Sequence, residues 1–252
     1  MHREAQCANL MVVSERIFSM EQIGREELNH ARSSETYLPA AGRDWALPLY
    51  DPFVKLLGAD AARRTLLQQA DLRPGHRVLD IGCGTGTFVA LIKRVHPEVS
   101  VAGLDPDPKA LARAKKKAAR AGVSIQFDQG FSDELPYADA SFDHVFSSFM
   151  FHHIHADQRQ QTLQEVYRIL SPGGSLHLLD FESSDDETQG VLARWLHSSH
   201  RLKDNSEIKI VGLMKGAGFA NAKKAGSGAL LLGHLRFGYY SGPRDDANVN
   251  SR

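Results

Sequence analysis

Few cysteines, no long apolar run and no excess of either charge characterise this sequence. Its 2 cysteines, Cys7 and Cys83, are too far apart to suggest a disulfide framework or a Cys-x-x-Cys metal site. No stretch approaches the roughly 18 apolar residues of a membrane span, and the N-terminal residues lack a secretory signal pattern. We therefore expect a cytoplasmic protein. Lysine plus arginine and aspartate plus glutamate both number 30, which argues against a nucleic-acid partner.

The remaining composition is that of an ordinary globular protein, with 42% hydrophobic and 24% charged residues. A chain of 252 residues suffices for one sizeable α/β core but hardly for two. Residues 1–44 are weakly patterned and are predicted to form a partly flexible arm. Residues 45–240 are predicted to form the main domain, and residues 241–252 a flexible tail.

Short apolar runs alternate with amphipathic segments in the main domain. Strands are predicted at 77–81, 99–104, 124–127, 142–147 and 176–181. Helices are predicted at 61–70, 87–95, 108–121, 157–170 and 208–217, with a closing turn at 171–174. Residues 219–225 and 230–237 are predicted to form a hairpin around the Gly-Ser-Gly at 226–228. We therefore expect a Rossmann-like three-layer sandwich, with a mostly parallel seven-stranded sheet that ends in an antiparallel hairpin strand.

A glycine-rich turn follows the first predicted strand, which ends in Asp80. Gly82, Gly84 and Gly86 have no side chains, so the backbone can turn tightly and approach a ligand closely. In open α/β sheets the ligand lies at the carboxyl ends of the strands, beside the first one. The turn therefore marks the candidate ligand site, although three alternate glycines do not by themselves identify the ligand.

The spacing of the glycines separates two classes of cofactor. A dinucleotide fingerprint, G-x-G-x-x-G, needs its third glycine where Thr87 stands. S-adenosylmethionine has no pyrophosphate, and its amino acid end offers an ammonium group that Asp80 can engage. We therefore predict S-adenosylmethionine as the cofactor. The alternatives are a nicotinamide-dependent oxidoreductase and a non-catalytic S-adenosylmethionine-binding module.

A second acidic residue, Asp105, ends the next predicted strand. A carboxylate there can accept hydrogen bonds from both hydroxyls of a ribose. The alternative is that it caps the following helix, a role that Asp107 can also fill.

Five motifs occur in order and at suitable spacing: Val78 to Gly86, Gly103-Leu104-Asp105, Leu135-Pro136-Tyr137, Ser141-Phe142-Asp143 and Val166 to Gly174. Together they resemble class I S-adenosylmethionine-dependent methyltransferases, in the small-molecule branch that includes the ubiquinone and menaquinone C-methyltransferases. The resemblance covers residues 50–181 strongly and the C-terminal hairpin weakly. It implies methyl transfer to a small-molecule acceptor by in-line displacement, with a possible substrate lid at 182–205.

The resemblance also assigns cofactor contacts residue by residue. It implies that the methionine end is lined by Asp80, Gly82, Cys83, Gly84, Ser147 and Ser148. Tyr50 resembles a family tyrosine that closes over the cofactor; the alternative is a half-buried core residue. Asp105 would hold the ribose, and Pro106 would flank the adenine. Gly130, Phe131 and Ser132 stand where the family has Gly-Asp-Ala, so Phe131 replaces the acid that bonds the adenine amino group.

Histidines follow the fourth predicted strand, where the acceptor is expected. A base that titrates near neutral pH assists methyl transfer to a phenol, enol or carbon nucleophile. His152 and His153 are the candidates, with Asp180 to orient one imidazole; the alternative for each histidine is a packing or capping role. No metal site is predicted, since no acidic or cysteine ligand has a matching spacing. The acceptor, the methylated atom and the oligomeric state are not indicated by the sequence.

Overall fold

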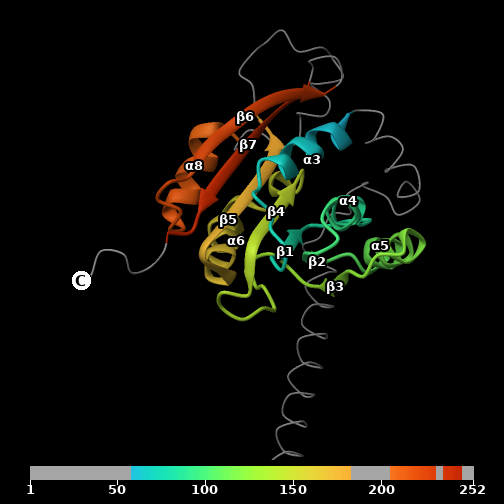
Figure 1. Cartoon of the computed structure of the whole chain (residues 1–252). Coiled ribbons are helices and arrows are strands. Elements are labelled where there is room, and N and C mark those ends of the chain that lie inside the picture. The colour runs from blue at the N-terminus through green and yellow to red at the C-terminus, as the bar shows by residue number, and fades with distance from the viewer. Residues whose placement is uncertain (1–57, 183–204, 231–234, 246–252) are drawn as a thin grey trace, which may run out of the picture. The chain divides into compact units, whose positions relative to one another are not determined.

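The computed structural model describes residues 58–182, 205–230 and 235–245. All of them belong to the second of the chain's two units, Pro39–Arg252. Its helices are α3 (Ala59–Gln68), α4 (Thr87–Val95), α5 (Pro108–Ala121), the 3₁₀ helix η2 (Phe151–His153), α6 (Ala156–Ile169) and α8 (Glu207–Gly216). Its strands are β1 (Arg77–Ile81), β2 (Ser100–Asp105), β3 (Gln126–Gln129), β4 (Phe142–Ser148), β5 (Leu170–Phe181), β6 (Lys223–Leu230) and β7 (Leu235–Pro243), as Figure 1 shows.

The strands form one seven-stranded sheet in the order β3-β2-β1-β4-β5-β7-β6. The pairs from β3 to β5 are parallel, whereas β7 is antiparallel to both β5 and β6. The chain thus begins the sheet at β1 in the middle, adds β2 and β3 on one side and then adds β4 and β5 on the other. Open α/β sheets bind ligands at such a switch point, which here lies between β1 and β4. The predicted mostly parallel sheet with an antiparallel C-terminal hairpin is confirmed.

Two apolar clusters, one on each face of the sheet, make up the core. On one face, residues of α3 and α4 such as Leu66, Phe88 and Ile92 pack together with Phe146. On the other face, Leu163 of α6 and Met214 of α8 belong to the second cluster. This division gives the predicted three layers, with the sheet as the middle one.

The C-terminal hairpin differs from the prediction in where its strands lie. The glycines at 226 and 228 stand inside β6, and β7 begins at Leu235. A Cβ atom at Gly228 would lie 2.4 Å from the Phe237 ring, so this glycine makes room for the aromatic side chain of the paired strand. The sequence pattern was misread because these glycines permit a close cross-strand contact rather than a turn.

Two other boundaries differ from the prediction by more than two residues. The segment predicted as a turn at 171–174 belongs to β5, although Gly173 has a φ of 77° and the pairing with β4 is irregular there. Strand β7 continues to Pro243, past the predicted start of the tail at residue 241. Arg244 then bonds residue 173 through its backbone and places its guanidinium 5.0 Å from the centroid of the Tyr167 ring. These contacts explain why the order extends beyond the predicted boundary.

A chain of histidines joins the residue before β1 to residues within β4 and β5. His144 lies between His76 and His177, with ring nitrogens 3.2 Å from a ring nitrogen of each neighbour. Ser175 Oγ lies 2.8 Å from His177 Nε2. Burial is the main cause that lowers the pKa of His144 to about 4 and that of His177 to about 3. The charge of His76 lowers the pKa of His144 further, and the charge of His144 lowers that of His177. Both rings are therefore neutral in the folded protein at neutral pH.

We expect the His177→Gln variant to lose less stability than the wild type on acidification. The folded-state pKa of His177 is depressed, so the unfolded chain takes up a proton first, and stability falls as the pH drops below the unfolded pKa of about 6.5. For each such proton, the free energy of unfolding changes by up to about 1.4 kcal/mol per pH unit. Denaturant unfolding of both proteins between pH 7 and 5, with His155→Gln as an exposed control, measures this difference; a pH-independent difference would contradict the expectation.

Candidate functional site

The carboxyl ends of β1, β2 and β4 meet around the glycine loop, residues 82–86. The loop is anchored to the neighbouring strand, because the backbone N–H groups of Gly82 and Cys83 donate to the Leu104 carbonyl at 2.8 and 3.0 Å. Helix α4 begins directly after Gly86, which is its left-handed N-cap. The free N–H groups at such a helix start suit an anionic or polar ligand group.

Two of the loop glycines are required by both conformation and space. Gly82 and Gly86 have φ angles of 72° and 76°, a region that side chains disfavour. A Cβ atom at Gly82 would lie 2.2 Å from Met150 Cγ, and one at Gly86 would lie 2.8 Å from the Ala114 Cβ of α5. The loop therefore packs closely against Met150, which precedes η2, and against α5. The buried Cys83 side chain fills the space over Gly103, where an added Cβ would meet its Sγ at 2.9 Å.

Asp105 connects the glycine loop to the start of α5. Its Oδ2 accepts the Gly84 N–H at 2.8 Å and its Oδ1 accepts the Asp107 N–H at 2.9 Å. Burial raises the pKa of Asp105 to about 6, against the lowering effect of these two hydrogen bonds. The N-cap of α5 is Asp107, whose side chain accepts the Lys109 N–H at 2.8 Å. The cap thus belongs to Asp107, and the Asp105 carboxyl stays at the end of β2.

Asp80 is the most unusual polar residue of this edge. Its carboxyl is 1% exposed, and its Oδ1 has no hydrogen-bond partner within the described ranges. Burial raises its pKa to about 8; the charge of Arg63 opposes this rise and that of Asp105 adds to it. Ser147 Oγ, at the end of the adjacent β4, is likewise buried without a partner there. Buried polar atoms are normally satisfied, so these two indicate a ligand with hydrogen-bond donors.

Arg63 of α3 is a site residue that the sequence analysis missed. Its Nε donates to Ser148 Oγ at 3.2 Å, and its guanidinium carbon lies 5.8 Å from the centroid of the Phe149 ring. These contacts, together with its effect on the Asp80 pKa, place a positive charge beside the end of β4. No local motif marks this arginine, because α3 was recognised by its apolar positions and its polar side was left unassigned.

The residues predicted to surround the adenine lie beyond β2 and β3. The Gly130 N–H donates to the Asp105 carbonyl at 3.3 Å, and Gln129 Nε2 donates to the Pro106 carbonyl at 3.2 Å. The structure thus brings Pro106 and the 130–132 segment next to Asp105. Phe131 is half-buried there. Ser132 is engaged differently, since its hydroxyl lies 3.0 Å from the Thr162 hydroxyl of α6.

His152 and Asp180 form a buried pair at the carboxyl ends of β4 and β5. The Asp180 carboxyl is fully buried and accepts the His152 backbone N–H at 2.8 Å. Its Oδ1 lies 2.6 Å from His152 Nδ1 and also accepts the Phe181 N–H at 2.7 Å. Because the carboxylate can only accept, Nδ1 carries the proton and Nε2 of the neutral ring is the acceptor. The structure therefore assigns the Asp180 partner to His152.

The neighbouring aromatic residues divide between this edge and the core. The His153 ring lies against His152, with centroids 4.1 Å apart and the ring planes tilted by 39°. Phe149 and Phe151 are buried in the two apolar clusters, whereas Met150 is half-buried beside the glycine loop. Phe149 adopts a positive φ of 55°, held by its N–H donating to the Leu179 carbonyl at 2.7 Å. Backbone strain of this kind is common at functional sites.

Lys117 connects α5 to the glycine loop. Its ammonium donates to Thr87 Oγ1 at 2.6 Å and to Thr85 Oγ1 at 3.2 Å, and its side chain is half-buried. We expect Lys117→Met to weaken binding of S-adenosylhomocysteine, the demethylated form of the predicted cofactor, by about threefold to tenfold. The reason is that the loop loses about one or two of the hydrogen bonds that hold it. Titration calorimetry measures this change. Lys116→Met, on the exposed side of the same helix, is the control, and equal affinities for both variants would contradict the positioning role.

Some predicted residues fall outside the described ranges. Tyr50 and most of the predicted lid belong to the residues outside the description. Within the described ranges, no cluster of three or more metal-ligating side chains is found. The helices described there include none that is long and apolar enough to span a membrane.

Comparison with known proteins gives consistent matches. A family model described as a methyltransferase domain matches residues 78–174. A demethylmenaquinone methyltransferase of Deinococcus radiodurans is 41% identical over 158 residues, which cover 62% of this chain and 64% of that protein. A demethylmenaquinone methyltransferase of Thermus thermophilus is 35% identical over 150 residues, which cover 58% of this chain and 67% of that protein. This chain thus matches slightly less than two thirds of the Deinococcus relative.

Among solved structures, the YcgJ protein from Bacillus subtilis has the same fold. It superposes with a TM-score of 0.62 and 20% identity over 75% of this chain and 100% of that one. The methyltransferase family and its solved neighbours bind S-adenosylmethionine or S-adenosylhomocysteine. From the matched domain, the identity with the Thermus protein and the shared fold, it follows that this chain belongs to the S-adenosylmethionine-dependent methyltransferases.

Proposed function

We propose that this chain transfers the methyl group of S-adenosylmethionine to a small-molecule acceptor. The observation that carries the proposal is the buried Asp80 carboxyl, whose Oδ1 lacks a partner among the described residues, at the carboxyl ends of the strands where open α/β sheets bind ligands. An ammonium group supplies the donor that this atom needs. When bound, this cofactor would supply a methyl group on a positively charged sulfur. In an in-line displacement the acceptor atom bonds to the methyl carbon while the carbon–sulfur bond breaks, and the demethylated cofactor leaves.

The chain's own residues fit the two ends of this cofactor. Asp80 accepts hydrogen bonds from its ammonium, and the Arg63 guanidinium beside Ser148 suits its carboxylate. Asp105 accepts from the ribose hydroxyls in addition to the two backbone N–H groups that already orient it. Pro106, Gly130 and Phe131 flank the adenine. Phe131 offers a ring face for stacking, and this compensates for the acid that the family usually has at this position.

His152 is proposed as the general base. Asp180 holds its Nδ1–H, so the proton of the acceptor passes to Nε2, and the imidazolium that forms is stabilised by the buried carboxylate. The side chain of His152 is 13% exposed, so the ring retains access to a ligand. The His153 ring packs against this ring and is proposed to limit its rotation. A base of this kind favours an acceptor with an acidic O–H or C–H group.

The acceptor class follows from this chemistry and from the relatives. Two of them are named demethylmenaquinone methyltransferases, and a third is a 27-O-demethylrifamycin SV methyltransferase of Amycolatopsis mediterranei, 39% identical over 112 residues. We propose that this chain acts on a hydroxylated aromatic or quinol-type molecule in the cytoplasm, with 182–205 as the lid over it. Residues 1–44 as an arm and 45–240 as the catalytic domain remain predictions.

The test is turnover by the purified full chain. It is incubated with S-adenosylmethionine carrying a deuterated methyl group and a panel of quinols and phenols, and products are detected by mass spectrometry. Appearance of the label in an acceptor supports the proposal. Binding of the demethylated cofactor without any transfer would favour a binding module, and no binding at millimolar concentration would overturn the cofactor assignment. The nicotinamide-dependent alternative is tested by the same titration with NADH.

A further inference from the structure

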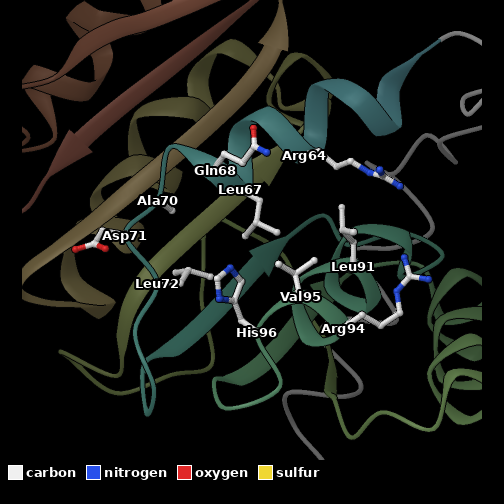
Figure 2. A pocket seen from close by; sticks show the side chains of 10 residues that line it. All are labelled: Arg64, Leu67, Gln68, Ala70, Asp71, Leu72, Leu91, Arg94, Val95 and His96. Atoms are coloured by element: carbon white, nitrogen blue, oxygen red, sulfur yellow. The ribbon is translucent and has the colours of Figure 1, made fainter.

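A groove lies between α3 and α4, at the end of α4 that is remote from the glycine loop. It has a volume of about 600 Å³ and is lined by the second half of α3, the segment at 70–72 and the last residues of α4 (Figure 2). Helix α4 rises about 1.5 Å per residue, so Val95 at its end lies about 12 Å along the axis from Thr87 at its start. The volume is in the range of small-molecule sites.

The floor of the groove is apolar, and part of it faces solvent. Figure 2 shows Leu67 pointing from α3 toward Leu91 and Val95 of α4. Leu67 is 4% exposed, Leu91 is half-buried and Val95 is 54% exposed. Within the described part of the chain, the only other large hydrophobic residue as exposed is Ile208 of α8. A ligand with an apolar body would remove this surface from water.

Two arginines give the groove a positive charge. Arg64 of α3 and Arg94 of α4 are both exposed, and Figure 2 shows their guanidinium groups at the same end of the groove. Of the nearby acids, Asp71 bonds Arg73 at 2.5 Å, Asp60 lies 3.9 Å from Arg63, and Glu98 lies 3.6 Å from His96 Nδ1. Among the described residues, no ion pair engages Arg64 or Arg94. Both are therefore available to an anionic ligand.

We propose that this groove binds a small amphipathic carboxylic acid. Its carboxylate would lie between Arg64 and Arg94, because guanidinium groups pair with carboxylates through two parallel hydrogen bonds. Its aliphatic or aromatic body would cover Leu67, Leu91 and Val95. A neutral lipid would leave both guanidinium groups without a partner, and a nucleic acid would find an apolar floor between only two positive charges. This site is independent of the proposed methyl transfer, since none of its residues belongs to the cofactor edge.

Solution NMR of the full chain with ¹³C-labelled leucine and valine methyl groups tests this proposal. Sodium decanoate, kept below its micelle-forming concentration, is expected to shift the Leu67, Leu91 and Val95 methyl signals in a saturable manner. The Arg64→Gln/Arg94→Gln double variant should bind at least tenfold more weakly, because the charge-assisted hydrogen bonds are lost. Val95→Asp should weaken binding similarly. Arg120→Gln, an exposed arginine of α5, is the matched control and should bind within twofold of the wild type.

Several outcomes would overturn the proposal. One is the absence of saturable shifts at millimolar decanoate, and another is equal binding by the wild type and the double variant. Equal binding of decanol would show that the charge has no role. Shifts caused only by anionic lipid vesicles would identify a membrane surface instead of a free acid. Since all substituted side chains are exposed, thermal unfolding should confirm that the variants fold like the wild type.

Discussion

His152→Gln is expected to lower the kcat of methyl transfer by about two to four orders of magnitude, the usual contribution of a positioned general base. Glutamine keeps a polar side chain of similar size but cannot accept the proton of the acceptor. The backbone N–H of residue 152 still donates to Asp180, so the fold of the segment is retained. The dissociation constant of the demethylated cofactor, measured by calorimetry, should remain within about twofold, since this side chain is not placed against the cofactor.

The variants of the neighbouring residues separate a base from a packing role. Asp180→Asn should also lower kcat and should change the pH dependence of the rate, because the amide no longer stabilises the charged imidazole or fixes its tautomer. His153→Gln should retain most activity, because the structure gives the Asp180 hydrogen bond to His152 alone among the described histidines. Full activity of His152→Gln, or equal losses in both histidine variants, would remove the proposed dyad from the mechanism.

The parallel part of the fold was predictable because its signals are local. Strand β1 and helices α4 and α5 have the predicted bounds, and Gly122, with a φ of 66°, ends α5 as expected. Period-two and period-3.6 apolar patterns report burial directly, so a single sequence suffices for them. The strands of the C-terminal hairpin were predicted at the wrong residues because a glycine can mark either a turn or a close contact between strands. Gly228 makes room for Phe237 across the sheet, and such a contact has no local signature.

The site was predictable where function depends on position along a strand. Asp80, Asp105 and Asp180 were singled out because each stands at or next to the carboxyl end of a strand, and the structure brings all three to the same edge of the sheet. Arg63 and Lys117 were missed because each reaches the site from a helix distant in sequence. A charged residue on a helix is usually solvated, and only tertiary packing reveals when one turns inward. Sequence reasoning therefore finds groups at strand ends more readily than their helical partners.

The affinity for the cofactor is expected to rise with pH, by up to about tenfold per pH unit between pH 6 and 7.5. Burial raises the pKa of Asp80 to about 8 in the ligand-free protein, so its carboxyl is mostly protonated in this range. Binding of an ammonium group favours the carboxylate, and the carboxyl must then release its proton. Affinity therefore increases as the pH approaches 8 and levels off above it, where the carboxyl is already ionised. Calorimetry with the demethylated cofactor across this range measures the slope.

The protonation of Asp80 can also be tested by counting the protons that are released when the cofactor binds. Titrations at pH 6.5 in buffers of different ionisation enthalpy should report the release of close to one proton for the wild type, because Asp80 is protonated before binding and ionised after it. Asp105, with a pKa raised to about 6, adds at most a small share at this pH. Asp80→Asn keeps the shape of the side chain and removes the titration, so its affinity should be weaker and nearly independent of pH. Equal proton release by the wild type and this variant would show that Asp80 does not meet the ammonium group.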